Sequence, residues 1–186
     1  MRHIVPIVLL CLLTIATASC KKAKLRSQLK ELMNSTIVLP EKIVCVEDGE
    51  IFPMPDSIRN IAKLVVYVDS SECTTCRISH IGKYRQIFRL SEEKGSFGVM
   101  LLFPSVVLSG IPVERYVMDS DVGYPIFIDI ENKFLKLNPS VAADHRLHSF
   151  LIDDKGTPLC VGDPSASREM LHVFGRAVSN ITNFKN

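Results

Sequence analysis

The stretch Leu64-Val65-Val66-Tyr67-Val68, followed five residues later by Cys73-Thr74-Thr75-Cys76, decides the fold of this chain. The first stretch is apolar without alternation, a pattern typical of a strand that is buried on both faces of a sheet. The two cysteines then open a segment of helical periodicity. We therefore expect them at the junction between a buried strand and a helix.

The residues from Cys73 to about Glu93 predict one amphipathic helix of several turns. Its inward positions recur every three or four residues, and Gly95 ends the pattern. On this interpretation Cys76 faces inward, one turn after Cys73. The inward positions are Cys76, His80 and Ile81, Tyr84, and Ile87 and Phe88.

The rest of the chain alternates between strand and helix patterns. Asp153-Asp154-Lys155-Gly156 predicts the loop of an antiparallel hairpin, and Asp163 and Pro164 open a last amphipathic helix. This order predicts an α/β fold with a central mixed β-sheet between helical layers. The other predicted strands are Phe97 to Phe103, Pro125 to Ile130, Leu147 to Ile152 and Leu159 to Val161, with shorter ones at Thr36 to Leu39 and Lys42 to Val46.

The first twenty residues have the composition of a secretory signal. Arg2 and His3 supply a basic start, Ile4 to Ala18 is largely apolar, and small residues precede Cys20. A cysteine at this position resembles the lipobox of bacterial lipoproteins, although Thr17 stands where that family usually has Leu. The resemblance implies that Cys20 is lipidated and becomes the mature N-terminus. The alternatives are an uncleaved apolar anchor and plain secretion with Cys20 free.

The chain divides into three predicted parts. We expect a lipoprotein signal peptide at residues 1–19, a basic linker or helix at residues 20–35 and one globular domain at residues 36–186. The linker either lies on anionic headgroups or forms a solvated helix. Its cations are Lys21, Lys22, Lys24, Arg26 and Lys30, and Leu25, Leu29 and Leu32 share one helical face.

The composition does not suggest a nucleic-acid-binding protein. The net charge is +2, Trp is absent and aromatic residues make up 7% of the chain, so neither a basic surface nor a base-stacking platform is expected.

Six cysteines are present. Once Cys11 and Cys20 are assigned to the signal and the lipid, Cys45 and Cys160 remain beside the close pair. Export lets disulfides persist, and whether Cys45 and Cys160 pair stays open.

The spacing and placement of Cys73 and Cys76 indicate thiol–disulfide exchange. The N-terminus of a helix stabilises a thiolate on the first cysteine, and the second lies within reach of a mixed disulfide. A zinc site would need four ligands, and Cys45 and Cys160 are isolated in the sequence. A c-type haem site needs His after the second cysteine, where this chain has Arg77. A structural disulfide across so short a loop adds little stability.

Four features resemble the thioredoxin-like superfamily, over roughly Val38 to the end of the chain: Val65 to Cys76, the helix predicted after it, Tyr124 to Asp129 and Ser149 to Leu159. Within it, the chain is most similar to the membrane-anchored thiol–disulfide reductases of the TlpA- and ResA-like branch, which act in envelope redox homeostasis and cytochrome maturation. The resemblance implies that Cys73 is the nucleophile and that Cys76 resolves the mixed disulfide. It also implies a thioredoxin-like fold for the domain.

Three departures from that family's pattern lie around the cysteines. Glu72 replaces the common Trp, and a carboxylate there tends to raise the pKa of a neighbouring thiolate. Thr74-Thr75 replaces Gly-Pro. Arg146-Leu147-His148-Ser149 lacks the cis-proline that shapes the family's substrate groove, and this loss bears on how a peptide-like substrate docks.

The missing proline also opens a second hypothesis. That proline helps to keep metals off the dithiol, and His148, with His80 or His145, could complete a Cys-Cys-His site for Cu(I). A further candidate is Asp69, either a proton acceptor for Cys76 or a turn residue.

The sequence therefore predicts an envelope thiol–disulfide oxidoreductase that is lipid-anchored to a membrane and faces the periplasm. It would act on protein thiols and disulfides through Cys73 and Cys76, with an envelope electron donor and without a bound cofactor. The alternative is a non-catalytic thioredoxin-like lipoprotein that binds a partner or Cu(I).

Overall fold

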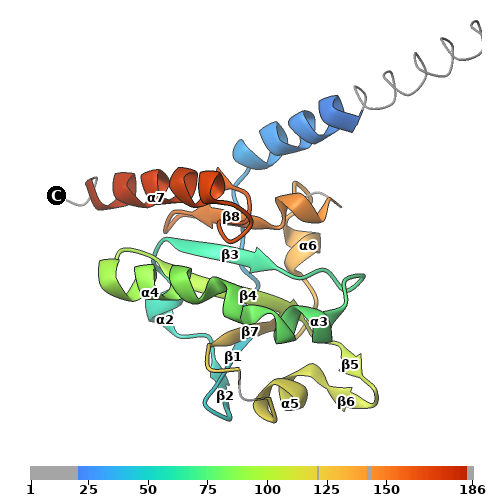
Figure 1. Cartoon of the computed structure of the whole chain (residues 1–186). Coiled ribbons are helices and arrows are strands. Elements are labelled where there is room, and N and C mark those ends of the chain that lie inside the picture. The colour runs from blue at the N-terminus through green and yellow to red at the C-terminus, as the bar shows by residue number, and fades with distance from the viewer. Residues whose placement is uncertain (1–20, 121, 142–143, 184–186) are drawn as a thin grey trace, which may run out of the picture.

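Seven strands form one mixed sheet in the computed structural model of the protein, which describes residues 21–120, 122–141 and 144–183 (Figure 1). The predicted signal peptide and Cys20 lie outside the described residues. The strand order across the sheet is β2-β1-β7-β4-β3-β8-β9. The strands are β1 (Ile43–Glu47), β2 (Glu50–Pro53), β3 (Lys63–Tyr67), β4 (Gly98–Pro104), β7 (Ile126–Asp129), β8 (Ser149–Ile152) and β9 (Pro158–Val161).

The centre of the sheet is parallel and its margins are antiparallel. β3 runs parallel to β4, and β4 runs parallel to β7. β8 pairs antiparallel with β3, and β9 pairs antiparallel with β8, as the predicted hairpin requires. Every residue of β3 and β4 is buried because helices cover both faces of the sheet.

Helices cover the two faces in separate sets. One face carries α3 (Thr74–Ser79), the 3₁₀ segment η1 (Ile81–Tyr84), α4 (Arg85–Lys94), α5 (Val113–Met118) and α7 (Arg168–Asn183). The other carries α2 (Asp56–Arg59), α6 (Phe134–Leu137), the 3₁₀ segment η2 (His145–Leu147) and the helical residues 21–33. A small second sheet joins β5 (Val107–Leu108) to β6 (Ile111–Pro112). Among the described residues, no helix combines the length and the apolar character needed to cross a membrane.

Two apolar cores result, one on each face of the sheet. Side chains of β3 alternate between them: Leu64 and Val66 enter the core under α4 and α7, whereas Val65 and Tyr67 enter the opposite core. This alternation follows from the two-residue period of a strand. The arrangement confirms the predicted thioredoxin-like α/β fold, with its central mixed sheet between helical layers.

The helix predicted from Cys73 to about Glu93 is interrupted, because η1 separates α3 from α4. The carbonyl of Cys76 accepts hydrogen bonds from the hydroxyl of Ser79 (3.0 Å) and from Nδ1 of His80 (2.6 Å). These side chains compete with the backbone N–H of His80, which donates instead to the carbonyls of Arg77 and Ile78. Local side-chain hydrogen bonds therefore end α3 early.

Residues 36–39, predicted as a strand, are irregular and lie outside the sheet. Both backbone polar groups of Val38 bond to the side-chain amide of Asn138, which accepts from the N–H at 2.7 Å and donates to the carbonyl at 2.8 Å. The N–H of Ile37 donates to the carbonyl of Gly156 (2.8 Å). Partners outside the sheet thus replace a neighbouring strand.

Cys45 and Cys160 do not pair with each other. They lie on β1 and β9, far apart in the strand order, and their side chains enter different cores. Both are free and buried. Burial raises the pKa of the Cys45 thiol to about 12 and also raises that of Cys160. Both are therefore packed, unreactive thiols in the folded protein.

Candidate functional site

Cys73 and Cys76 form a disulfide at the N-terminal end of α3, with their Cα atoms 5.3 Å apart. Cys73 is the N-cap residue of this helix, and its Sγ accepts a hydrogen bond from the backbone N–H of Cys76 (3.3 Å). The hydroxyl oxygen of Thr75 lies 3.4 Å from the same sulfur. After reduction, both groups are placed to donate to a thiolate on Cys73.

Both cysteines are exposed, so the inward orientation predicted for Cys76 is wrong. The residues of α3 that enter the core are Thr74 and Ile78, four positions apart and each 5% exposed. Cys76 lies midway between them in sequence, and about 200° around the helix from either. A reagent or a substrate protein can therefore reach either sulfur.

A tight turn carries the chain from β3 to the disulfide. The N–H of Glu72 donates to the carbonyl of Asp69 (2.9 Å), and the N–H of Asp69 donates to the carboxylate of Glu72 (3.1 Å). The carboxylate of Asp69 accepts from the N–H of Ser71 (2.8 Å) and from its hydroxyl. The hydroxyl of Ser71 is the main reason that the pKa of Asp69 lies below its usual range. Of its two predicted roles, Asp69 fills that of a turn residue.

Glu72 is held between two basic side chains. Its Oε2 lies 3.4 Å from Nε of Arg77, and its Oε1 lies 3.5 Å from Nδ1 of His148. The guanidinium of Arg77 offsets the negative charge of Glu72 beside Cys73. The repulsion between Glu72 and a Cys73 thiolate is consequently weaker than the sequence alone indicates.

His148 lies directly before β8, within the segment Arg146 to Ser149, which lacks a proline. It is 2% exposed, and its carbonyl accepts a hydrogen bond from the N–H of Tyr67 (2.8 Å). The rings of His148 and Tyr67 meet edge to face at 5.4 Å. No cis peptide bond occurs in the described ranges. A buried histidine in this segment is thus joined to the turn before Cys73.

The Cu(I) site considered from the sequence is not assembled in the described part of the chain. There, no group of three or more His, Cys, Asp or Glu side chains is placed to hold a metal ion. Nδ1 of His80 contacts the carbonyl of Cys76, and His148 faces Glu72. His145 belongs to η2 and lines a hollow that includes neither cysteine.

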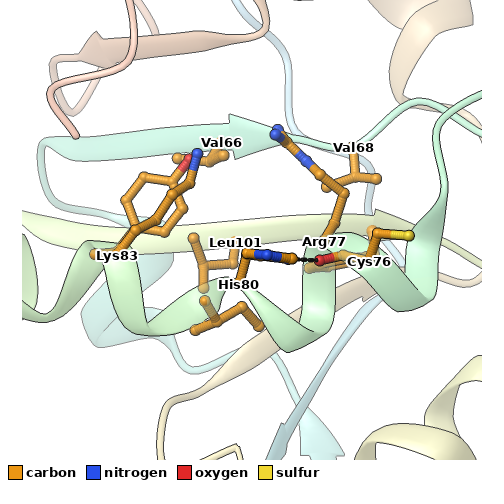
Figure 2. Close-up of a pocket in the computed structure, with 10 residues that line it drawn as sticks. Val66, Val68, Cys76, Arg77, His80, Lys83 and Leu101 are labelled. Atoms are coloured by element: carbon orange, nitrogen blue, oxygen red, sulfur yellow. Dashed lines mark hydrogen bonds between the residues drawn. The ribbon is translucent and has the colours of Figure 1, made fainter. Parts of the chain in front are cut away.

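An apolar cavity of about 330 Å³ lies behind Cys76, between the α3–η1 segment and the strands β3 and β4 (Figure 2). Sequence analysis missed this cavity, which lies where the predicted helix is interrupted. Gly82, inside a helical pattern, was the one local signal of that interruption. The lining residues include Val66, Val68, Leu101 and Phe103 of the sheet, with Arg77, His80 and Lys83 of the helical segment.

The carboxylate of Asp163 links the η1 segment to the turn before α7 through hydrogen bonds. Its Oδ2 accepts from Nζ of Lys83 (2.9 Å) and from the hydroxyl of Tyr84 (3.1 Å). Its Oδ1 accepts from the N–H (2.9 Å) and the hydroxyl (2.6 Å) of Ser165. Burial alone would raise the pKa of Asp163, but the hydrogen bonds from Ser165 and Lys83 hold it below its usual range. The wall of the cavity beside Cys76 is therefore fixed by a charged contact.

No family model matches the sequence, and no curated protein matches it significantly. Solved structures do resemble the fold. One, described as a thiol:disulfide interchange protein DsbE from Chlorobium tepidum, is 17% identical, with 77% of this chain and 98% of that chain covered and a TM-score of 0.47. Another, described as a protein disulfide isomerase from Bacteroides thetaiotaomicron, is 18% identical, with coverages of 79% and 86% and a TM-score of 0.47.

The mitochondrial 2-Cys peroxiredoxin from Plasmodium falciparum is also similar in structure. It is 22% identical, with 78% of this chain and 92% of that chain covered and a TM-score of 0.44. At identities under 25% and TM-scores under 0.5, these similarities carry no argument about the site. The chemistry of the site is therefore inferred from this chain's own residues.

Proposed function

We propose that this protein exchanges thiols and disulfides with other proteins through Cys73 and Cys76. The observation that carries the proposal is an exposed disulfide at the N-terminal end of α3, a few residues after the buried strand β3. The N–H of Cys76 and the hydroxyl of Thr75, both beside Sγ of Cys73, favour Cys73 as the sulfur that becomes the thiolate.

In the reducing direction, the Cys73 thiolate attacks a disulfide of the substrate protein. A mixed disulfide forms, and one substrate sulfur leaves as a thiolate that takes a proton from solvent. Cys76, after losing its proton to solvent, attacks the Cys73 sulfur and releases the second substrate sulfur. Two electrons pass to the substrate, and an electron donor in the envelope restores the dithiol. In the oxidising direction, the same steps run in reverse.

We also propose that the protein works in the cell envelope, as a lipid-anchored member of the membrane-anchored thiol–disulfide reductase branch. The basic start, the apolar run and Cys20 support this location. Labelling of growing cells with a radioactive fatty acid tests the anchor. Wild-type protein should carry label and the Cys20→Ala variant should not, whereas a wild-type protein without label would overturn the lipidation.

A redox titration tests the exchange reaction. The protein is equilibrated in dithiothreitol or glutathione buffers, alkylated, and the state of Cys73 and Cys76 is read by mass spectrometry. We expect a reversible two-electron midpoint in the range of known exchange proteins, roughly −120 to −270 mV. Cys45 and Cys160 are internal references, because burial keeps both thiols from changing state in the folded protein.

The same titration separates this proposal from a non-catalytic binding module. The missing proline is the observation that favours such a module. A pair that stays oxidised far below that range, or that forms no disulfide, would support the module. For Cu(I), stoichiometric metal retained by the reduced protein and lost in the His148→Ala variant would support metal binding.

A further inference from the structure

The helical residues 21–33 carry the densest positive charge of the described chain. This helix contains five exposed cations and a single carboxylate, that of Glu31. In Figure 1 this helix, drawn in blue, projects from the body of the domain. The cations are Lys21, Lys22, Lys24, Arg26 and Lys30.

The apolar side of this helix is already occupied by the domain. Leu32 is fully buried in the core that also holds Tyr67 and Phe134, and Leu25 packs against the same core. An interfacial helix that inserts into a bilayer needs a free apolar face. On the same side Leu29 keeps 36% of its surface exposed, so the free apolar area of this helix is small and contact with a membrane surface must rest mainly on charge.

The exposed cations are arranged along one side of the helix. Lys22, Arg26 and Lys30 recur every four residues and therefore form one row, which lies about 80° around the helix from Leu32 at Lys22 and about 160° from it at Lys30. A row of this kind can meet a flat anionic surface with all three side chains at once. Scattered cations on a globular surface cannot do so.

The first turn of the helix shares a hollow with η2 and the preceding Asp144. Lys21 and Lys24 line a hollow of about 480 Å³ together with His145 and Arg146. Arg146 is paired with Asp144 at 2.6 Å, and this contact is the main reason that the pKa of Asp144 falls to about 2. Among the described residues that line this hollow, the one carboxylate is that of Asp144, which pairs with Arg146, so the positive charge of Lys21 and Lys24 remains and suits a phosphate group.

We propose that residues 21–33 are a docking surface for an anionic lipid bilayer. The row of Lys22, Arg26 and Lys30 contacts headgroup phosphates without insertion of the helix. The surface directly follows the apolar run and Cys20, the features that predict a membrane anchor, so it would lie against the membrane in either predicted anchoring mode. The inference does not depend on the dithiol chemistry, and inactivity of the cysteines would leave it intact.

The test compares binding of the full chain to vesicles of pure phosphatidylcholine and to vesicles that also contain phosphatidylglycerol. Residues 1–20 are the same in every variant, so their apolar contribution cancels in the ratio of the two partition coefficients. In the variant Lys22→Gln, Arg26→Gln, Lys30→Gln, this ratio should fall roughly 100-fold, because each cation near an anionic surface contributes about fivefold. High salt should lower the wild-type ratio similarly.

The matched control neutralises three exposed cations of α4 in the variant Arg85→Gln, Arg89→Gln, Lys94→Gln. It has the same net charge as the first variant and should keep most of the wild-type preference for phosphatidylglycerol. Glutamine preserves helix propensity, so circular dichroism should show both variants folded. An unchanged ratio in the first variant, or an equal fall in the control, would overturn the proposal.

Discussion

Replacement of Asp163 by Asn should destabilise the protein at neutral pH and have little effect at acid pH. In the wild type, Oδ2 of Asp163 accepts from Lys83 and Tyr84, whereas Oδ1 accepts twice from Ser165. The Asn side chain can keep its carbonyl oxygen toward Ser165. Its NH₂ group then faces two donors and loses both contacts to η1.

The expected loss is about 3 kcal/mol at neutral pH. A hydrogen bond to a charged group contributes about 1.5–3 kcal/mol, and two are lost. The sum is discounted because the Lys83 side chain is 36% exposed and its charge is screened by solvent. Since the pKa of Asp163 is lower in the folded state, its contribution is fully present above the unfolded value of about 3.9 and disappears as the pH falls through the folded value.

Urea denaturation of the oxidised protein, between about pH 7 and about pH 3, measures this difference. The gap between wild type and Asp163→Asn should narrow as the pH falls. In a Lys83→Met background the same replacement should cost less, because one of its partners is already gone. A gap that is independent of pH, or one below about 0.5 kcal/mol at neutral pH, would refute this account of Asp163.

Three further predictions concern the thiols and one buried cation. Cys73→Ser should abolish exchange, whereas Cys76→Ser should trap a mixed disulfide visible by mass spectrometry; activity that survives Cys73→Ser would contradict the assigned roles. After reduction, Cys45 and Cys160 should alkylate far more slowly than the exposed pair, since burial raises the pKa of both; equal labelling rates in folded protein would show that they are accessible. Burial lowers the pKa of Lys63 to about 8, so the folded state binds fewer protons than the unfolded chain above that pH. The wild type should gain stability in urea titrations as the pH rises from about 8 to about 10.5, a gain that Lys63→Met should lack.

The central strands could be predicted from the sequence because they are almost entirely apolar. Apart from Lys63 at the start of β3, the runs that form β3 and β4 contain no charged side chain, and only a sheet covered on both faces buries them. The hairpin between β8 and β9 could also be predicted, because its loop contains a glycine where a positive φ is needed. Gly156 adopts such a φ (86°). These features depend on residues close together in the chain.

The face that α3 turns to the core could not be decided in the same way. A helical period fits Cys76 with His80 as well as it fits Thr74 with Ile78, and only packing against the sheet selects the second pair. The contact of Glu72 with His148 could not be predicted from the sequence either. It joins residues far apart in sequence, and a single sequence holds no record of such pairing.

The buried thiols of Cys45 and Cys160 matter most before the chain has folded. Residues 36–186 contain four cysteines, for which three fully paired arrangements are possible, and the native state uses none of them. Each core must therefore close over its thiol before that thiol meets an oxidant. Newly made protein that is oxidised too early would form scrambled disulfides, and would itself need the kind of repair that exchange enzymes perform. The order of folding and oxidation is thus a requirement placed on this protein's own biosynthesis.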